Sequence, residues 1–494
     1  MRTNKLRYAT LLVIGSLTLG GPLMAVQELW SAKLKEKVEW NALTDLGTLL
    51  VGTKGAVESY DPDTGALLWR REDLVKTNVH NAREVAGTPF LLCNLSSGLG
   101  GSKVKLQSID YLSGETVWQA PEIQGQYLAT YPIPEHGIAI FVFNSWGGNG
   151  EQAGLILRAH DLRTGETKWE SRFGKSTAVP LHLADGSGKF MPRMDLSGYH
   201  DPVVDGDIAY IGFTGVHAID LKTGVIKWGV EFKPGAKDFK RTYAPIRIEG
   251  DRLYAAGGGS VYAIEKSTGK TLWTSDRISS YAGLFKARDN AIVSQVEPIN
   301  GKVFIRFGGN FSNGQTVVLR EPLGVAAFDA QTGDEVFKFT KAEEGITNLM
   351  VLHERSTVLF ADAGQLYGLD VSGTTPTEKF AVPIEFKRKM GGGDVAKIGL
   401  GVLGGVSGIV KATMAQSKSR LDVPVAITLR EGHIVVMGKQ HLMGYDPVAQ
   451  NFKWSTYYAA PGDGLGDSML FAATAFAAVV GNAQAAAAPS YSSS

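Results

Sequence analysis

The sequence has a single cysteine, Cys93, in a chain of 494 residues. One cysteine excludes an internal disulfide, and it excludes a Cys-x-x-Cys-His site for attaching a haem. Cys93 ends the strand-like stretch Phe90–Cys93, which predicts a small apolar side chain packed inside the protein. The stability of the fold must then come from the size of its core.

An excess of charge of either sign is also missing. The chain has 50 Lys and Arg against 49 Asp and Glu, and its net charge is +1. This balance argues against a nucleic-acid partner. The nine histidines form no i, i+4 metal-ligand pair and no recognisable triad, and no glycine-rich run opens a helix as a phosphate loop would. We therefore predict no catalytic, cofactor-binding or metal-binding residue.

The N-terminus has the layout of a secretory signal peptide. Three basic residues (Arg2, Lys5 and Arg7) precede an apolar run that ends at Met24-Ala25. This order predicts a signal peptide over residues 1–25, the alternative being an uncleaved anchor. No cysteine follows the apolar run, so the chain is not a lipoprotein. We expect an exported bacterial protein of the periplasm or the outer membrane.

A ten-residue motif returns along the rest of the chain. It first appears at Tyr60–Trp69 and reads apolar–Asp–x–x–Thr–Gly–x–x–x–Trp. Its acidic position recurs at roughly 40- to 60-residue intervals, which is typical of a repeat architecture such as a propeller. The acidic positions are Asp61, Asp110, Asp161, Asp220, Glu265, Asp329, Asp370 and Asp446.

Each residue type in the motif has a structural task. Asp accepts backbone N–H groups in a turn, and Gly supplies a positive φ. Trp lies on the following outer strand, where it can wedge between two blades. We assign this task to Trp30, Asp61, Gly65, Trp69, Asp110, Gly114, Trp118, Asp161, Gly165, Trp169, Asp220, Gly224, Trp228, Gly269, Trp273, Asp329, Gly333 and Trp454.

Upstream of each acidic residue, the alternation of apolar residues predicts the second and third strands of a blade. The eight hairpins span residues 48–60, 89–110, 137–161, 207–220, 251–265, 302–329, 356–370 and 432–446. The predicted fold is all-β, a single eight-bladed β-propeller of four-stranded antiparallel blades over residues 26–460. Trp30 and Trp454 each lie in a stretch that reads as an outer strand, and the sequence leaves open which of the two closes the eighth blade.

Three of the hairpins have long loops, predicted at Asn94–Lys103, Asn144–Gly154 and Gly308–Glu321. In an up-and-down blade these loops lie on the face opposite the Thr-Gly turns. Trp146 and Phe311 fall at two of the loop tips, where aromatic residues favour a binding patch. We name both as candidate partner-binding residues.

Two apolar segments interrupt or follow the repeats. The insertion 386–422, between the seventh and eighth blades, carries a glycine-rich stretch at Ile398–Val410, and the tail 461–494 carries an alanine-rich one at Met469–Gly481. We expect both stretches to be helical and the end of the tail to be disordered. The sequence leaves three alternatives for these segments. They could contact a membrane surface, through 386–422 and 467–482, a partner protein, or the propeller itself. The candidate partner-binding cations are Lys387, Arg388, Lys389, Lys397 and Lys411.

The motif resembles the Trp-motif repeat of pyrroloquinoline-quinone (PQQ) type propellers, and its style is BamB-like. The resemblance implies a propeller and leaves function open, because the family includes quinoprotein dehydrogenases as well as cofactor-free scaffolds of outer-membrane protein assembly. We expect a non-catalytic scaffold that binds envelope or outer-membrane proteins and needs no cofactor. The alternative is a periplasmic dehydrogenase with PQQ and Ca²⁺ that lacks the usual vicinal disulfide, and a third hypothesis is a subunit of a larger membrane complex.

Overall fold

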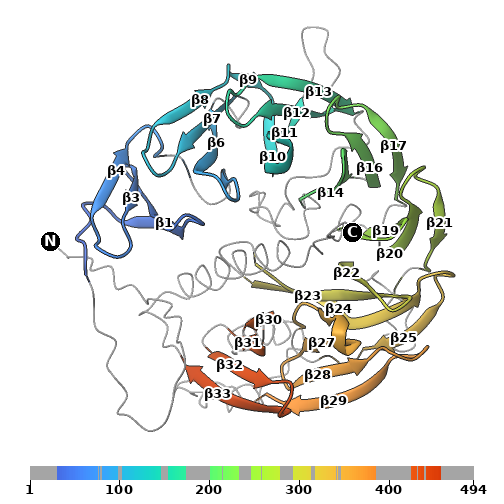
Figure 1. Ribbon diagram of the computed structural model, residues 1–494. Coiled ribbons are helices and arrows are strands. Elements are labelled where there is room, and N and C mark those ends of the chain that lie inside the picture. The colour runs from blue at the N-terminus through green and yellow to red at the C-terminus, as the bar shows by residue number, and fades with distance from the viewer. Residues whose placement is uncertain are drawn as a thin grey trace, which may run out of the picture. The chain divides into compact units, whose positions relative to one another are not determined.

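The structure is a computed structural model in which the described residues form mainly β-strands (Figure 1). It describes residues 30–75, 77, 81–97, 103–145, 154–173, 201–213, 215–232, 246–257, 259–276, 278, 293–312, 317–340, 342, 346–384, 424, 426–430, 432–438 and 441–457. Among these residues the helices are two short 3₁₀ turns, η2 (Pro134–His136) and η5 (His353–Arg355).

The strands form successive antiparallel sheets in which sequence neighbours pair, as in the blades of a β-propeller. Sheet β1–β4 comprises Val38–Leu43, Leu49–Thr53, Val57–Tyr60 and Leu67–Arg71. Sheet β5–β8 comprises Ala82–Glu84, Phe90–Ser97, Lys103–Asp110 and Thr116–Gln119, with β9 (Ile123–Gln124) paired to β7. Sheet β10–β13 comprises Gln126–Ile133, Ile138–Ser145, Gly154–Asp161 and Thr167–Phe173. Sheet β14–β17 comprises Val203–Asp205, Ile208–Gly212, Gly215–Asp220 and Ile226–Glu231.

Four further sheets have the same order. Sheet β18–β21 comprises Arg247–Glu249, Arg252–Gly257, Ser260–Glu265 and Thr271–Thr274. Sheet β22–β25 comprises Val293–Ile299, Lys302–Ser312, Val317–Asp329 and Glu335–Phe339. Sheet β26–β29 comprises Met350–Leu352, Thr357–Ala361, Gln365–Asp370 and Thr377–Pro383. Sheet β30–β33 comprises Ala426–Arg430, His433–Met437, His441–Asp446 and Asn451–Tyr457.

The chain divides into two compact units. The first contains residues 1–178 together with the turn 220–225, and the second contains residues 179–219 and 226–494. Within each unit the middle strands carry the core; for example, the side chains of β3 and β27 are all buried. The all-β fold of propeller type is thus confirmed, while closure of these sheets into one ring of eight blades stays a prediction.

The motif turn has the predicted geometry. Asp61 Oδ1 accepts the backbone N–H groups of Asp63 at 2.9 Å and Thr64 at 2.8 Å. Gly65 has φ +70° and donates its N–H to the Asp61 carbonyl at 2.8 Å. A residue with a Cβ adopts this left-handed conformation at a cost, which explains the glycine. The same cap forms at Asp110, Asp161, Asp220 and Asp329.

Each motif glycine is also covered by the ring of a tryptophan that lies earlier in the chain. Trp69 donates its indole N–H to the Tyr111 carbonyl at 2.8 Å, and a Cβ on Gly114 would lie 2.6 Å from the Trp69 ring. The glycine is therefore required twice, for its φ and for the ring that covers it. The same indole-to-carbonyl bond joins Trp30 to Pro62, Trp118 to Leu162, Trp169 to Leu221, Trp228 to Lys266 and Trp273 to Ala330.

One junction works without a tryptophan. Phe337 occupies the Trp position on β25, and its side chain has no N–H group to donate. The carbonyl of Val371, which follows Asp370, instead accepts from Lys302 Nζ at 3.2 Å and from Asn300 Nδ2 at 3.4 Å. Lys302 is almost fully buried. Two residues of the preceding sheet thus supply the hydrogen bond that one indole supplies elsewhere.

The sequence located the second and third strands of all eight sheets, and each predicted hairpin is paired. The loop predicted at Gly308–Glu321 is wrong, because β23 and β24 continue as a ladder to the pair Ser312 and Val317. Phe311 accordingly belongs to a strand and pairs with Val318. The composition of Gly and Asn suggested a loop, but the register shifts between Phe307 and Gly309 and pairing then resumes.

The question of Trp30 and Trp454 is answered by the sheet order. The stretch Asn451–Tyr457 is β33, the fourth strand of its sheet, whereas Trp30 precedes β1 and lies in no strand. Trp30 nevertheless fills the Trp position on the Asp61 turn. Trp454 is 42% exposed and covers Gly444 of its own sheet. The signal peptide, the insertion 386–422 and the tail 461–494 lie outside the described residues.

Candidate functional site: an apolar turn end

The motif carboxylates are committed to the turns. Hydrogen bonds from the Thr64 backbone and hydroxyl hold the pKa of Asp61 below its usual range. The backbone N–H groups of Thr332 and Gln331 do the same for the pKa of Asp329. A carboxylate that accepts several N–H groups is stabilised in its charged form. The predicted structural role of these residues agrees with this geometry.

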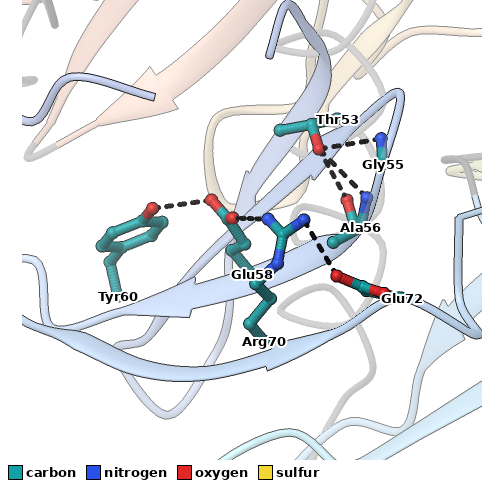
Figure 2. A network of polar contacts seen from close by, with 7 residues as sticks. All are labelled: Thr53, Gly55, Ala56, Glu58, Tyr60, Arg70 and Glu72. Atoms are coloured by element: carbon teal, nitrogen blue, oxygen red, sulfur yellow. Dashed lines mark hydrogen bonds and ion pairs between the residues drawn. The ribbon is translucent and has the colours of Figure 1, made fainter. Parts of the chain in front are cut away.

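Carboxylates buried between strands are satisfied in the same way. Figure 2 shows Glu58 on β3 between Tyr60, whose hydroxyl donates at 2.7 Å, and Arg70, which forms a short ion pair with it. The same view shows Thr53 Oγ1 accepting the backbone N–H groups of Gly55 and Ala56 at the adjoining turn. A paired carboxylate of this kind holds two strands together and is poorly placed to act as a base.

The buried nucleophile and imidazoles belong to the packing. Cys93 is buried, as the sequence predicted, and burial raises the pKa of its thiol to about 12, so the thiol is protonated. His160 stacks on Trp118 with ring centroids 6.1 Å apart, and its Nδ1 lies 2.8 Å from the Gly165 carbonyl. Burial lowers the pKa of His217 to about 4, which keeps its imidazole neutral.

The inner strands of the second unit are linked by polar side chains. Arg247 on β18 makes a two-pronged ion pair with Glu297 on β22, at 3.0 and 2.9 Å. Gln295 both donates to and accepts from the backbone of Leu349, and Asn348 does so with Ile427. These contacts link β18 to β22, β22 to the segment that precedes β26, and that segment to β30.

A PQQ–Ca²⁺ pair would need converging carboxylate and amide oxygens. On the inner strands of the second unit, the Glu297 carboxylate is held by Arg247 and Gln295, and the Gln295 and Asn348 amides are held by the backbone. The part of the chain that the structure describes contains no group of three or more His, Cys, Asp or Glu able to hold a metal ion. These residues do not fit the cofactor.

Exposed apolar side chains gather at the turn end of the first two sheets. Leu43 is 66% exposed, Leu46 46%, Leu67 52%, Leu68 45% and Leu112 43%. We call these five residues the leucine edge. They lie where β1 meets β2, where β3 meets β4, and where β7 meets β8. An exposed apolar group of this size marks an interaction site more often than a single exposed leucine does.

Sequence reasoning missed the leucine edge. Its signal was the Leu67-Leu68 pair ahead of Trp69, at positions that hold Thr-Lys ahead of Trp169 and Ile-Lys ahead of Trp228. Of the residues named as partner-binding, Phe311 has a described backbone, within β23. Trp146, Lys387, Arg388, Lys389, Lys397 and Lys411 lie outside the described residues.

The described residues contain no helix that is long and apolar enough to span a membrane.

Comparison with known families matches the model described as "Outer membrane protein assembly factor BamB" at residues 26–171 and 152–336. The match covers more than half of the chain. The protein belongs to this family. This match confirms the resemblance to PQQ-type, BamB-like propellers.

Solved structures give more distant likenesses. BamB from Moraxella catarrhalis is 15% identical, with a TM-score of 0.43, over 81% of this chain and 92% of its own. A quinohemoprotein alcohol dehydrogenase from Pseudomonas putida is 12% identical, with a TM-score of 0.39, over 84% of this chain and 70% of its own. No curated protein matches the sequence.

Proposed function

We propose that this protein is an exported, non-catalytic β-propeller that binds protein partners in the bacterial cell envelope. The observation that carries the proposal is the division of labour within the repeats. Their Asp, Gly and Trp residues are engaged in turns and sheet junctions, while the exposed apolar side chains of the leucine edge are engaged in neither.

Family membership supports the same function. The family description is that of an outer-membrane protein assembly factor, and such a role requires a surface that holds another protein. A leader-like N-terminus would deliver the chain to the envelope. The proposed partners are envelope or outer-membrane proteins, and the proposed location is the periplasm or the outer membrane.

Cross-linking in isolated bacterial envelopes tests this function. A tagged chain is cross-linked, purified under denaturing conditions and searched by mass spectrometry for partner proteins. We expect reproducible cross-links to envelope proteins from the surface of the described sheets. The contrary result is a purified protein that binds PQQ stoichiometrically with Ca²⁺ and reduces a dye with alcohols or sugars, because the chain would then be a dehydrogenase.

A further inference from the structure

Four residues of the leucine edge lie at one end of the first sheet. The register places Leu43 opposite Leu49, Leu49 opposite Tyr60, and Tyr60 opposite Leu67. Residues paired in this way lie in one row across the four strands. Leu46 lies in the turn that follows Leu43, and Leu68 falls at the register shift beside Leu67. Exposed leucines therefore stand on the innermost and the outermost strand of the same row.

The edge continues onto the second sheet. Trp69 donates to the Tyr111 carbonyl, so the outer strand β4 lies directly against the turn that contains Leu112. Leu68 and Leu112 are the chain neighbours of these two bonded residues. A second link joins the inner strands, because the backbone N–H of Asp45 donates to Glu84 Oε1 on β5 at 2.8 Å. Both sheets belong to the first unit.

The turns around the leucines carry charge of only one sign. The four turns of these two sheets on this end span residues 44–48, 61–66, 85–89 and 110–115, and they contain no Lys or Arg. Their acidic residues are Asp45, Asp61, Asp63, Asp110 and Glu115. Arg71, which reaches this end by donating to the Gly114 carbonyl, is itself paired with Asp73 at 2.7 Å.

Three of the six corresponding motif turns elsewhere carry cations. The turn after β12 contains Arg163, the turn after β16 contains Lys222, and the turn after β20 contains Lys266 and Lys270. The motif turns after β24, β28 and β32 also lack Lys and Arg, but in those three sheets the turn between the first two strands contains or adjoins a cation: Lys302, Arg355 or Arg430. Two cation-free turns at the same end therefore distinguish the first two sheets.

We propose that this acidic leucine edge is the docking site for a segment of a partner protein in which apolar residues are accompanied by Lys or Arg. The proposal deepens the proposed function and rests on it. The leucines supply the apolar area, and the five carboxyl groups favour a cationic partner and disfavour an anionic one. A second copy docking through the same end would place like charges together, and an anionic lipid surface would be repelled for the same reason.

Binding of synthetic peptides to the purified full-length chain tests the chemistry directly. Three short fluorescein-labelled peptides are compared by fluorescence anisotropy, with alternating Leu and Lys, alternating Leu and Glu, and alternating Ser and Lys. We expect the Leu–Lys peptide to bind about tenfold more tightly than either of the others, a difference of about 1.4 kcal/mol. Its affinity should fall as salt is added.

Variants then locate the site. The double variant Leu67→Ser/Leu68→Ser should lose about tenfold in affinity for the Leu–Lys peptide, and so should Asp63→Lys/Glu115→Lys. Leu272→Ser is the matched control, because Leu272 precedes Trp273 as Leu68 precedes Trp69 and is 39% exposed. We expect this control to bind as the parent does. Thermal unfolding shows whether each variant is folded. If the leucine variant does not fold, the charge variant Asp63→Lys/Glu115→Lys still tests the site.

Three results would overturn the proposal: equal binding of all three peptides, equal loss in Leu272→Ser, or sedimentation showing a dimer that Leu67→Ser/Leu68→Ser dissolves. The last result would assign the edge to a second copy of the chain. If the chain still cross-links to envelope proteins but does not discriminate among the peptides, the scaffold function is retained and the leucine edge is excluded as its binding site. If no cross-link to an envelope protein forms, both the scaffold function and this binding site are contradicted.

Discussion

The motif turn of the first sheet (residues 61–66) and that of sheet β18–β21 (residues 265–270) have the same buried contacts but different solvent-facing residues. Both have a glycine at positive φ, +70° for Gly65 and +76° for Gly269, and both glycines are covered by a tryptophan, Trp30 and Trp228. Apart from the shared threonine (Thr64 and Thr268), the outward positions differ. Pro62 and Ala66 of the first turn correspond to Lys266 and Lys270 of the other.

This contrast separates two kinds of residue in one motif. The inner positions meet another sheet, so their chemistry is fixed by packing and by one carbonyl that needs a donor. The outer positions meet solvent, so they are free to carry a function that differs from sheet to sheet. The experiments below treat the two turns as a pair, from the largest expected effect to the smallest.

Removing the tryptophan from the outer strand of each of these two sheets, which packs on the next motif turn, should destabilise the protein equally and strongly in both cases. Trp69→Ala and Trp273→Ala each delete a ring that is at most 9% exposed and leave a buried carbonyl without its donor. We expect each variant to lose about 3–5 kcal/mol of unfolding free energy. Denaturant unfolding measures it. A small effect at one site would mean that the two junctions are not built on the same principle.

Adding a methyl group to the motif glycine should cost less, and again equally. A Cβ at Gly65 would lie 2.5 Å from the Trp30 ring and one at Gly269 would lie 2.6 Å from the Trp228 ring. Gly65→Ala and Gly269→Ala should each destabilise by about 2–4 kcal/mol through crowding and through the positive φ.

Gly137→Ala is the control for this pair. Gly137 has φ +64°, and its added Cβ would meet nothing within 4 Å. The backbone term alone should remain, about 1–2 kcal/mol. If this variant were as unstable as Gly65→Ala in the same unfolding experiment, the tryptophan would not be what demands the glycine.

The smallest expected effect is on the pH dependence of stability in acid. Because the pKa of Asp61 is lowered in the folded state by Thr64, its carboxylate adds stability at pH values above its ordinary pKa of about 3.9 and loses that contribution as the pH falls below it. Asp61→Asn should therefore be slightly less stable than the parent at pH 7, and the gap should narrow below about pH 4. Thermal unfolding across this range measures the gap. A gap that widened in acid would show that the carboxylate is not held ionised by its turn.

The sequence was sufficient for whatever the repeat itself encodes. Asp61, Gly65 and Trp69 predicted a turn and a junction because Asx capping, positive φ and ring burial are local or nearest-neighbour effects. Membership of the repeat family followed from the same residues, and the structure confirms their geometry.

Contacts that depend on the whole sheet could not be read in the same way. The Lys302 donor that replaces an indole is distant in sequence from its acceptor Val371, and nothing local marks it. The ladder through Phe311 and Val318 was hidden by a composition typical of loops. The leucine edge needed the register, because Leu43 and Leu67 share a row only once the four strands are aligned.

The account rests on the claim that the first turn end binds a partner and that its counterpart in sheet β18–β21 does not. A photo-cross-linking amino acid placed at position 68 or at position 272, in cells that express the full chain, compares the two directly. We predict a cross-link from position 68 to a partner peptide that is apolar and rich in Lys or Arg, with none from position 272. Cross-links of equal strength from both positions, or a partner captured from position 272 alone, would contradict it.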